Sequence, residues 1–286
     1  MSIKITSDST CDLPQELLDK YEISTIPLCV MLGADEFYDG QTITPSNIFE
    51  YVSKTKTLPK TAARSVEDFK EFFKQFLDNG DEVVHIGISS GLSVCYNNCL
   101  KAKEELGSDK LHIVDGRSLS TGTGLLLIHA AELAKKGKTA TQIAEIERER
   151  ALSTQASFIV ETLDYLHKGG RCSTLSLLGA NILGIKPRLQ VVDSKLISTG
   201  KYRGKMKPVI LKYIDDTLSN FNNPDTARCF ITHASAEPEF VEEVVNYVKT
   251  KNLFKEIFVS TAGATITSHC GKGTLGILYI NDGGRR

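Results

Sequence analysis

Apolar and polar residues follow two different spacings along the first half of the chain. Short apolar runs such as "EVVHIGIS" and "KLHIVDG" predict buried strands, and a segment of helical periodicity follows each run. One predicted helix, in "KTAARSVEDFKEFFKQFLDNG", carries four aromatic side chains on one face: Phe69, Phe72, Phe73 and Phe76. Ser65 and Asp68 resemble a capping box at its start. Strands that alternate with helices indicate a parallel sheet flanked by helices.

Two segments of this half depart from the alternation. The run "STIPLCVML" is predicted as a single strand, and "ADEFYDGQTIT" after it as a turn or short hairpin. In "TPSNIFEYVSK", Thr44 can cap a helix that has Pro45 at its first position.

The second half mixes hairpins with helices. The segment "LQVVDSKLISTGKYRG" predicts a hairpin that turns near Asp193 and Ser194, while "ARCFITHAS", "EIFVSTAG" and "GTLGILYIND" predict further strands. Two helices are predicted among them, in "PVILKYIDDTLSNF" and "PEFVEEVVNYVKTKN". This mixture indicates a mixed sheet. We therefore predict an N-terminal α/β domain over residues 1–152 and a C-terminal α/β domain over residues 153–286, with the boundary near Leu152.

Composition and charge narrow the class of protein. The chain has 286 residues, of which 41% are hydrophobic and 24% charged, as in ordinary water-soluble domains. A net charge of -1 gives no indication of nucleic acid or a membrane surface as a partner. We expect no transmembrane segment and no secretory leader. The seven cysteines show no C-x-x-C spacing, which favours reduced thiols and a cytoplasmic location.

Hydroxyl side chains gather where three predicted strands of the first half end. They are Ser7, Ser9 and Thr10; Ser89, Ser90 and Ser93; and Ser118, Ser120, Thr121 and Thr123. The carboxyl ends of parallel strands meet at one edge of an open sheet, where ligands bind. Helix N-termini at that edge offer free N–H groups, so this edge suits one small anion. The competing interpretation is that these residues only cap helices.

Ser93 is also a candidate nucleophile, because it stands between a predicted strand and a helix. The hydrolase elbow G-x-S-x-G requires a glycine where this chain has Cys95. A general base could come from His85, His112 or His269, but residue order alone identifies no triad. The pattern therefore gives an acyl hydrolase little support.

Motifs for cofactors are weak. No G-x-x-x-x-G-K-[ST] loop occurs, and "GKGTLG" at residues 271–276 precedes a predicted strand instead of opening a helix, so a turn between two strands is the better interpretation. Cys95 and Cys99 stand one helical turn apart and His269 adjoins Cys270, but no second close pair completes a zinc site. Core thiols are favoured, and His269 is predicted in a polar turn between two strands.

Basic residues concentrate in two places of the second half. In "LHKGGRCS", Arg171 follows two glycines, and "KYRGKMK" brings together Lys201, Arg203, Lys205 and Lys207. These side chains form either a solvated hairpin face or a docking surface for an anionic group or an acidic partner.

Eight segments, in their order and spacing, resemble the DegV family along nearly the whole chain. They are "KITSDSTCDLP", "YDGQTITP", "GISSGLSVCYNN", "HIVDGRSLSTGTG", "ETLDYLHKGGR", "GIKPRL", "GKYRGKMK" and "ITSHCGKGTLG". The resemblance implies a two-domain α/β protein that holds one long-chain fatty acid, such as palmitate or oleate, between its domains. It further implies a binding subunit, without catalysis or a cofactor of its own, that presents the carboxylate to a separate fatty-acid kinase.

The resemblance also assigns residues. The family's carboxylate-binding serine corresponds to Ser93, its Thr-Ser-rich loop supplies Thr61, and its C-terminal histidine corresponds to His269. Contacts to the partner or to phosphate are expected from Arg171, the arginine of the Gly-Gly-Arg motif, and from Arg203.

Four residues depart from the family pattern. Ala62 and Ala63 stand where a hydroxyl and a glutamine are usual, and Val94 and Cys95 replace the usual Gly-Thr. We therefore expect a less polar head-group pocket.

Two other functions remain open on the sequence. One is a serine-dependent acyl hydrolase with Ser93 as nucleophile and His269 as base. The other is a small-molecule kinase, which the lack of a phosphate-binding loop disfavours.

Overall fold

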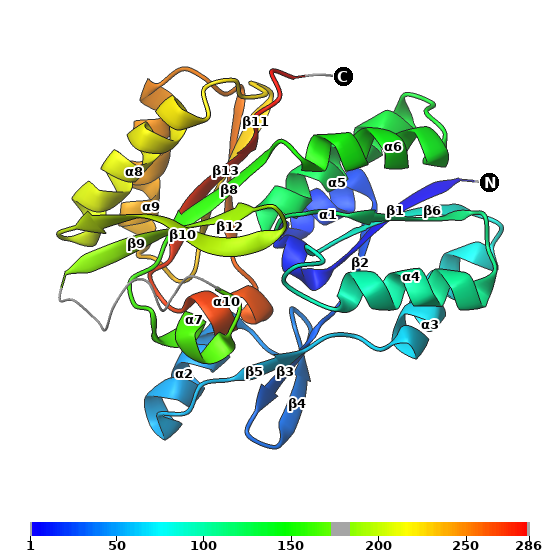
Figure 1. Ribbon diagram of the computed structural model, residues 1–286, viewed down its shortest axis with the longest axis horizontal. Helices are drawn as coiled ribbons and strands as arrows, with labels where there is room; N and C mark the ends of the chain where they lie inside the picture. The colour runs from blue at the N-terminus through cyan, green and yellow to red at the C-terminus, as the bar shows by residue number, and fades with distance from the viewer. Residues whose placement is uncertain (1, 173–183, 285–286) are drawn as a thin grey trace.

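The computed structural model describes residues 2–172 and 184–284. Over these residues the chain has a two-domain α/β fold that contains three sheets (Figure 1). The strands before the expected boundary at Leu152 form two of the sheets, and the strands after it form the third. The boundary at that residue itself stays a prediction.

The first sheet has four parallel strands in the order β2-β1-β6-β7. Their bounds are β1 Ile3–Asp8, β2 Ile23–Ile26, β6 Glu82–Gly87 and β7 Leu111–Asp115. The helices of this part are η1 Ser9–Cys11, α1 Gln15–Tyr21, α3 Val66–Leu77, α4 Cys95–Leu106, α5 Thr121–Lys135 and α6 Ala140–Ala151. Figure 1 shows α3 and α4 on one side of the sheet and α5 and α6 on the other. The predicted parallel sheet flanked by helices is therefore confirmed.

The second large sheet has six strands in the order β10-β9-β8-β13-β11-β12. Their bounds are β8 Thr154–Ile159, β9 Ile185–Val192, β10 Lys195–Arg203, β11 Arg228–His233, β12 Glu256–Thr261 and β13 Leu275–Ile280. Only β11 and β12 pair in parallel, and the other neighbours are antiparallel, which confirms the predicted mixed sheet. The helices of this part are α7 Asp164–Gly169, α8 Met206–Asn220, α9 Pro238–Thr250 and α10 Ala264–Cys270.

Helix α5 lies between the two large sheets. It contacts β1 and β6 of the parallel sheet and β8, β11 and β13 of the mixed sheet. Most residues of its segment "TGTGLLLIHAAELAK" are buried, as in a helix that lies between two layers. A Cβ on Gly122 would lie 2.2 Å from Ser118 Oγ, and one on Gly124 would lie 2.6 Å from Leu13 Cδ2. These glycines therefore allow the close packing.

The third sheet is small and corrects one prediction. It has the order β4-β3-β5, with β3 Cys29–Leu32, β4 Asp35–Tyr38 and β5 Lys60–Ala62, and helix α2 Pro45–Thr55 lies beside it. The run "STIPLCVML" is not one strand, because its first part belongs to β2 of the parallel sheet and its second part to β3. Pro27, which has no N–H group, stands at the break. This small sheet and α2 contact α10, which comes from the other end of the chain.

Several local predictions are confirmed. Ser65 and Asp68 form the expected capping box of α3. The hairpin of β9 and β10 turns at Asp193 and Ser194, whose φ angles of 46° and 65° match a tight hairpin turn. No helix in residues 2–172 and 184–284 is both long and apolar enough to cross a lipid bilayer.

Candidate functional site

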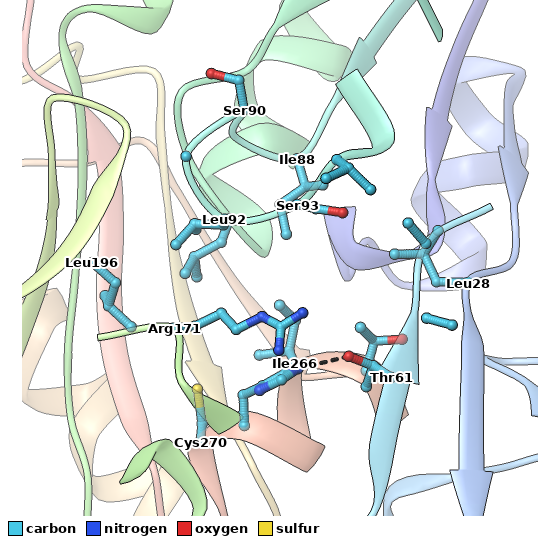
Figure 2. Close-up of a pocket in the computed structure, with 17 residues that line it drawn as sticks. Leu28, Thr61, Ile88, Ser90, Leu92, Ser93, Arg171, Leu196, Ile266 and Cys270 are labelled. Carbon is cyan, nitrogen blue, oxygen red and sulfur yellow. Dashed lines mark hydrogen bonds between the residues drawn. The ribbon is translucent and has the colours of Figure 1, made fainter. Parts of the chain in front are cut away.

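A cavity of about 310 Å³ lies where the parallel sheet, the small sheet and α10 meet (Figure 2). Its wall is mainly apolar and includes Leu28, Ile88, Leu92, Leu119, Leu196 and Ile266. Thr61, Ser93, Arg171 and His269 are among its polar lining residues. The structure thus brings together four of the five side chains that the sequence singles out, from segments far apart in the chain.

The loop between β6 and α4 positions Ser93. Ser93 N donates to Ser89 O at 3.1 Å, and Ser93 Oγ accepts from Cys95 N at 3.2 Å as α4 begins. Because its oxygen serves as the acceptor there, the hydroxyl proton remains available for a ligand. Ser93 therefore lies at the strand-to-helix junction that the sequence predicts.

Thr61 and His269 form a hydrogen-bonded pair in the cavity wall. Thr61 Oγ1 on β5 lies 2.8 Å from His269 Nε2 on α10, 208 positions away in sequence (dashed in Figure 2). Burial, together with the nearby positive charge of Arg171, lowers the pKa of His269 to about 4. The imidazole is therefore neutral near pH 7 and takes part in hydrogen bonding.

The prediction that His269 lies in a turn between two strands is wrong, because "ATITSHC" forms helix α10. Two carboxylates from distant turns hold the start of this helix. Asp39 Oδ1 accepts from Ala264 N at 2.7 Å and Asp39 Oδ2 from Thr265 N at 3.0 Å, while Asp12 Oδ1 accepts from Gly263 N at 2.8 Å. Neither residue is predicted from the sequence as part of the site. Their place in the turns "STCDLP" and "YDGQ" marks them only as turn residues.

Arg171 follows helix α7 and lines the same cavity. Its Nη1 donates to Gly169 O at 2.8 Å. A Cβ on Gly169 would lie 2.4 Å from His269 Nδ1, so this position requires glycine for α7 to pack against α10. The "GGR" sequence thus serves both the packing of His269 and the placement of Arg171.

Arg203 does not line this cavity. It ends strand β10 and lines a separate groove between β10 and α8. Its neighbour Lys207 lies 2.6 Å from Glu243 in an exposed ion pair. Arg171 and Arg203 thus line different hollows, and the expected contact of each with a partner or with phosphate stays a prediction.

The residues that depart from the family pattern also have defined positions. Ala62, Ala63 and Val94 line the cavity, while Cys95 is buried and does not line it. The cavity wall therefore contains three apolar side chains at these positions, while the expected decrease in head-group polarity stays a prediction.

A narrow apolar crevice of about 20 Å³ lies next to the cavity. The two share Leu119, Ile266 and Cys270 in their walls. Further in, the crevice reaches Phe158 and Leu278 of the mixed sheet. The apolar space therefore leads from the hydroxyl groups toward the six-stranded sheet.

The geometry gives the hydrolase alternative no support. His269 Nε2 faces Thr61, and no hydrogen bond joins Ser93 to His269 in the described part of the chain. His269 Nδ1 is buried and has no hydrogen-bond partner there, so no carboxylate orients the ring as a triad requires.

No group of three or more His, Cys, Asp or Glu side chains within residues 2–172 and 184–284 could hold a metal ion. Cys95 and Cys99 are both buried free thiols in the core, as the sequence analysis favours.

A family model described as "Uncharacterised protein, DegV family" matches residues 2–282. The chain belongs to the DegV family. A DegV domain-containing protein of Clostridium perfringens is 30% identical over 280 residues, which cover 98% of this chain and 99% of the relative. A relative from Thermotoga maritima named "Fatty acid-binding protein" is 32% identical over 284 residues and covers 96% of each chain.

Solved structures of DegV proteins have the same fold. A protein from Thermus thermophilus, described by the words "Fatty Acid Binding of a DegV family Protein", superposes with a TM-score of 0.90 at 27% identity over 98% of this chain and 99% of its own. The fatty acid-binding DegV of Bacillus subtilis superposes with a TM-score of 0.85 at 25% identity over 98% of this chain and 99% of its own. Both of these DegV proteins are described as binding fatty acids.

Proposed function

We propose that this protein binds one long-chain fatty acid, such as palmitate or oleate, in the cavity at Ser93, with Thr61 and His269 at its carboxylate. One observation carries the proposal. Three hydrogen-bonding side chains line one mainly apolar cavity that shares part of its wall with an apolar crevice. The fatty-acid binding of related DegV proteins supports it.

The head group needs donors, because a buried carboxylate without hydrogen bonds is costly. Ser93 can donate its hydroxyl proton, since its oxygen already accepts from Cys95 N. If the neutral His269 donates from Nε2 to Thr61, the Thr61 hydroxyl proton is also free for the carboxylate. Arg171 adds a positive charge at the same cavity. Hydrogen bonds to a charged group are worth about 1.5–3 kcal/mol each.

The tail supplies most of the affinity. Burial of roughly 14 methylenes at about 0.8 kcal/mol each gives a gross gain of about 11 kcal/mol. This gain is of the same order as the cost of association, about 4–15 kcal/mol, so the hydrogen bonds at the carboxylate also contribute to the net affinity. A tail that passes Leu119 and Ile266 would enter the crevice beside Phe158.

The proposal extends to the fate of the bound acid. The protein presents the carboxylate to a separate fatty-acid kinase in the cytoplasm and performs no catalysis itself. Arg171 is suited to this step, since a planar guanidinium beside the carboxylate can also stabilise the oxygens of an acyl phosphate. Hydroxyl donors hold the carboxylate without forming a covalent bond to it, so it stays reactive.

The test is organic extraction of the purified protein followed by mass spectrometry. We expect one fatty acid of roughly 14–18 carbons per chain, in line with the methylene estimate. An extract without fatty acid, from protein that also fails to bind added palmitate or oleate, would contradict the proposal. A chromogenic acyl ester serves as the control for hydrolysis, and turnover that Ser93→Ala abolishes would favour the hydrolase instead.

A further inference from the structure

A groove of about 630 Å³ lies between strand β10 and helix α8, apart from the fatty-acid cavity. On one side it is lined by the end of β10, from Thr199 to Arg203. On the other side it is lined by residues four positions apart on one face of α8, which are Pro208, Lys212, Asp216 and Asn220. The groove therefore runs along about 18 Å of helix, at about 1.5 Å per residue.

Positive charge dominates this groove. Four cationic side chains line it, Arg188, Lys201, Arg203 and Lys212, against the single carboxylate of Asp216. That carboxylate already accepts a hydrogen bond from Tyr202 Oη at 2.9 Å. None of the four cations forms an ion pair within the described part of the chain. An excess of three positive charges over the lining suits a multivalent anion.

Arg188 distinguishes the groove from an ordinary solvated basic face. Its side chain lines the groove although the residue is only 7% exposed. Its Nε and Nη2 are buried without a hydrogen-bond partner in the part of the chain that the structure describes. Buried N–H groups of a guanidinium that lack an acceptor cost free energy, which a bound anion would recover.

Two aromatic rings and a glycine of the neighbouring strand lie around Arg188. Its guanidinium carbon lies 5.8 Å from the ring centres of both Tyr213 and Phe221, at cation–π distance. Gly200 of β10 pairs with Arg188, and the register of β10 shifts between Ser198 and Gly200. The residue that faces Arg188 across the strand pair is thus a glycine beside a bulge, so β10 contributes no side chain at the paired position.

We propose that this groove is a second binding site, for a small molecule that carries two or more phosphate groups. The guanidinium fork of Arg188 suits two phosphate oxygens, and Lys201, Arg203 and Lys212 neutralise further charge along the groove. A single phosphate would span only a small part of it. The site does not depend on fatty-acid binding, because none of its lining residues lines the fatty-acid cavity.

The experiment is a calorimetric titration of the full chain with tripolyphosphate at fixed ionic strength. We expect saturable binding that Arg188→Met weakens by roughly 10- to 150-fold, since hydrogen bonds to a charged group are lost. The double variant Lys201→Ala/Lys212→Ala should weaken it about fivefold through lost surface charge alone. Lys101→Ala, which removes an exposed charge on α4, should leave it unchanged.

Three outcomes would overturn the proposal. The first is that tripolyphosphate shows no saturable binding. The second is that it binds, but neither the Arg188 variant nor the double lysine variant weakens its binding. The third is that citrate binds equally tightly and that both variants weaken its binding to the same extent. The last result would mean a site for any multivalent anion. If Arg188→Met fails to fold by circular dichroism, the double lysine variant, whose two side chains are exposed, decides the question.

Discussion

At the level of single residues, hydroxyl groups determine how the carboxylate is held. We expect Ser93→Ala to weaken fatty-acid binding by about 1.5–3 kcal/mol, because it removes one hydrogen bond to a charged group. Ser118→Ala is the matched control. Ser118 is also a serine at a strand end, but it is buried outside the cavity and its Oγ lacks a partner in the described part of the chain. Displacement of a fluorescent fatty acid measures both affinities, and equal losses would argue against the assignment of Ser93.

A substitution of Arg171 should distinguish the binding of the fatty acid from its delivery to the partner kinase. Arg171 lines the cavity but already donates one hydrogen bond to Gly169 O, so its contribution to the carboxylate is a partly screened charge. We expect Arg171→Ala to reduce fatty-acid affinity by about fivefold or less. Phosphorylation by the partner kinase should fall much further, because the acyl phosphate carries more charge than the acid.

The measurement for Arg171 is a binding titration beside a kinase-coupled assay on the same variant. Arg171→Lys is the control, since it keeps the charge and removes the planar fork. Losses of equal size in the two assays would assign Arg171 to the binding of the acid alone.

At the level of elements, α10 carries His269 and depends on Asp39. We expect Asp39→Asn to lower the free energy of unfolding by about 2–3 kcal/mol, since one acceptor of a buried N–H group becomes a donor. Fatty-acid affinity should fall as well, because His269 lies on the same seven-residue helix. Urea unfolding and the fluorescent ligand measure the two effects.

Thr44→Ala is the control for that prediction. Thr44 precedes α2 and donates to Asn47 Oδ1 at an exposed position. Loss of such an exposed cap should cost about 1 kcal/mol or less, and affinity should not change. An Asp39→Asn variant that loses stability but binds normally would show that α10 is positioned by other contacts.

Helix α10 also shows which features the local sequence pattern does not predict. The capping box of α3 and the turn at Asp193 are decided by neighbouring residues, so the local sequence predicts them correctly. Helix α10 is short and polar in sequence, and the carboxylate of Asp39 that starts it stands 225 positions earlier. The pattern of its own residues therefore resembles a turn. The strand run split at Pro27 was mispredicted for the same reason, since its two parts join different sheets.

The candidate site was predictable to a similar extent. The pattern of strand ends places Ser93 at a sheet edge, which the structure bears out. The meeting of Thr61 with His269 and Arg171 depends on how three distant segments pack, so only the resemblance to the DegV family indicated it. The sequence does not predict that Arg203 lies in a groove between β10 and α8, away from the cavity that Arg171 lines.

At the level of the whole molecule, buried titratable groups link stability to pH. Burial lowers the pKa of His85, which packs against the rings of Phe69, Phe72 and Phe73, to about 3. Burial also raises the pKa of the Asp12 carboxyl well above its usual range, which the hydrogen bond from Ser120 only partly opposes. The two groups therefore have opposite effects on the pH dependence of folding.

The sign follows from which state binds more protons. Below pH 6.5 the unfolded chain protonates its histidines, whereas folded His85 stays neutral until about pH 3. The contribution of His85 is thus complete above pH 6.5 and is lost as the pH falls toward 3. The folded state holds the proton of Asp12 more tightly than the unfolded chain, so its contribution is present at low pH and is lost as the pH rises.

We therefore expect His85→Gln and Asp12→Asn to change the pH dependence of unfolding in opposite directions. As the pH is lowered from 6.5 to 4, the free energy of unfolding of His85→Gln should fall less steeply than that of the parent protein. The two slopes should differ by about 1.4 kcal/mol per pH unit. Asp12→Asn should make the fall steeper, because it removes a group that favours folding in acid. Urea unfolding of ligand-free protein at a series of pH values compares the slopes, which are independent of any constant loss in stability. Parallel curves for His85→Gln and the parent would show that folded His85 binds its proton as readily as the unfolded chain does.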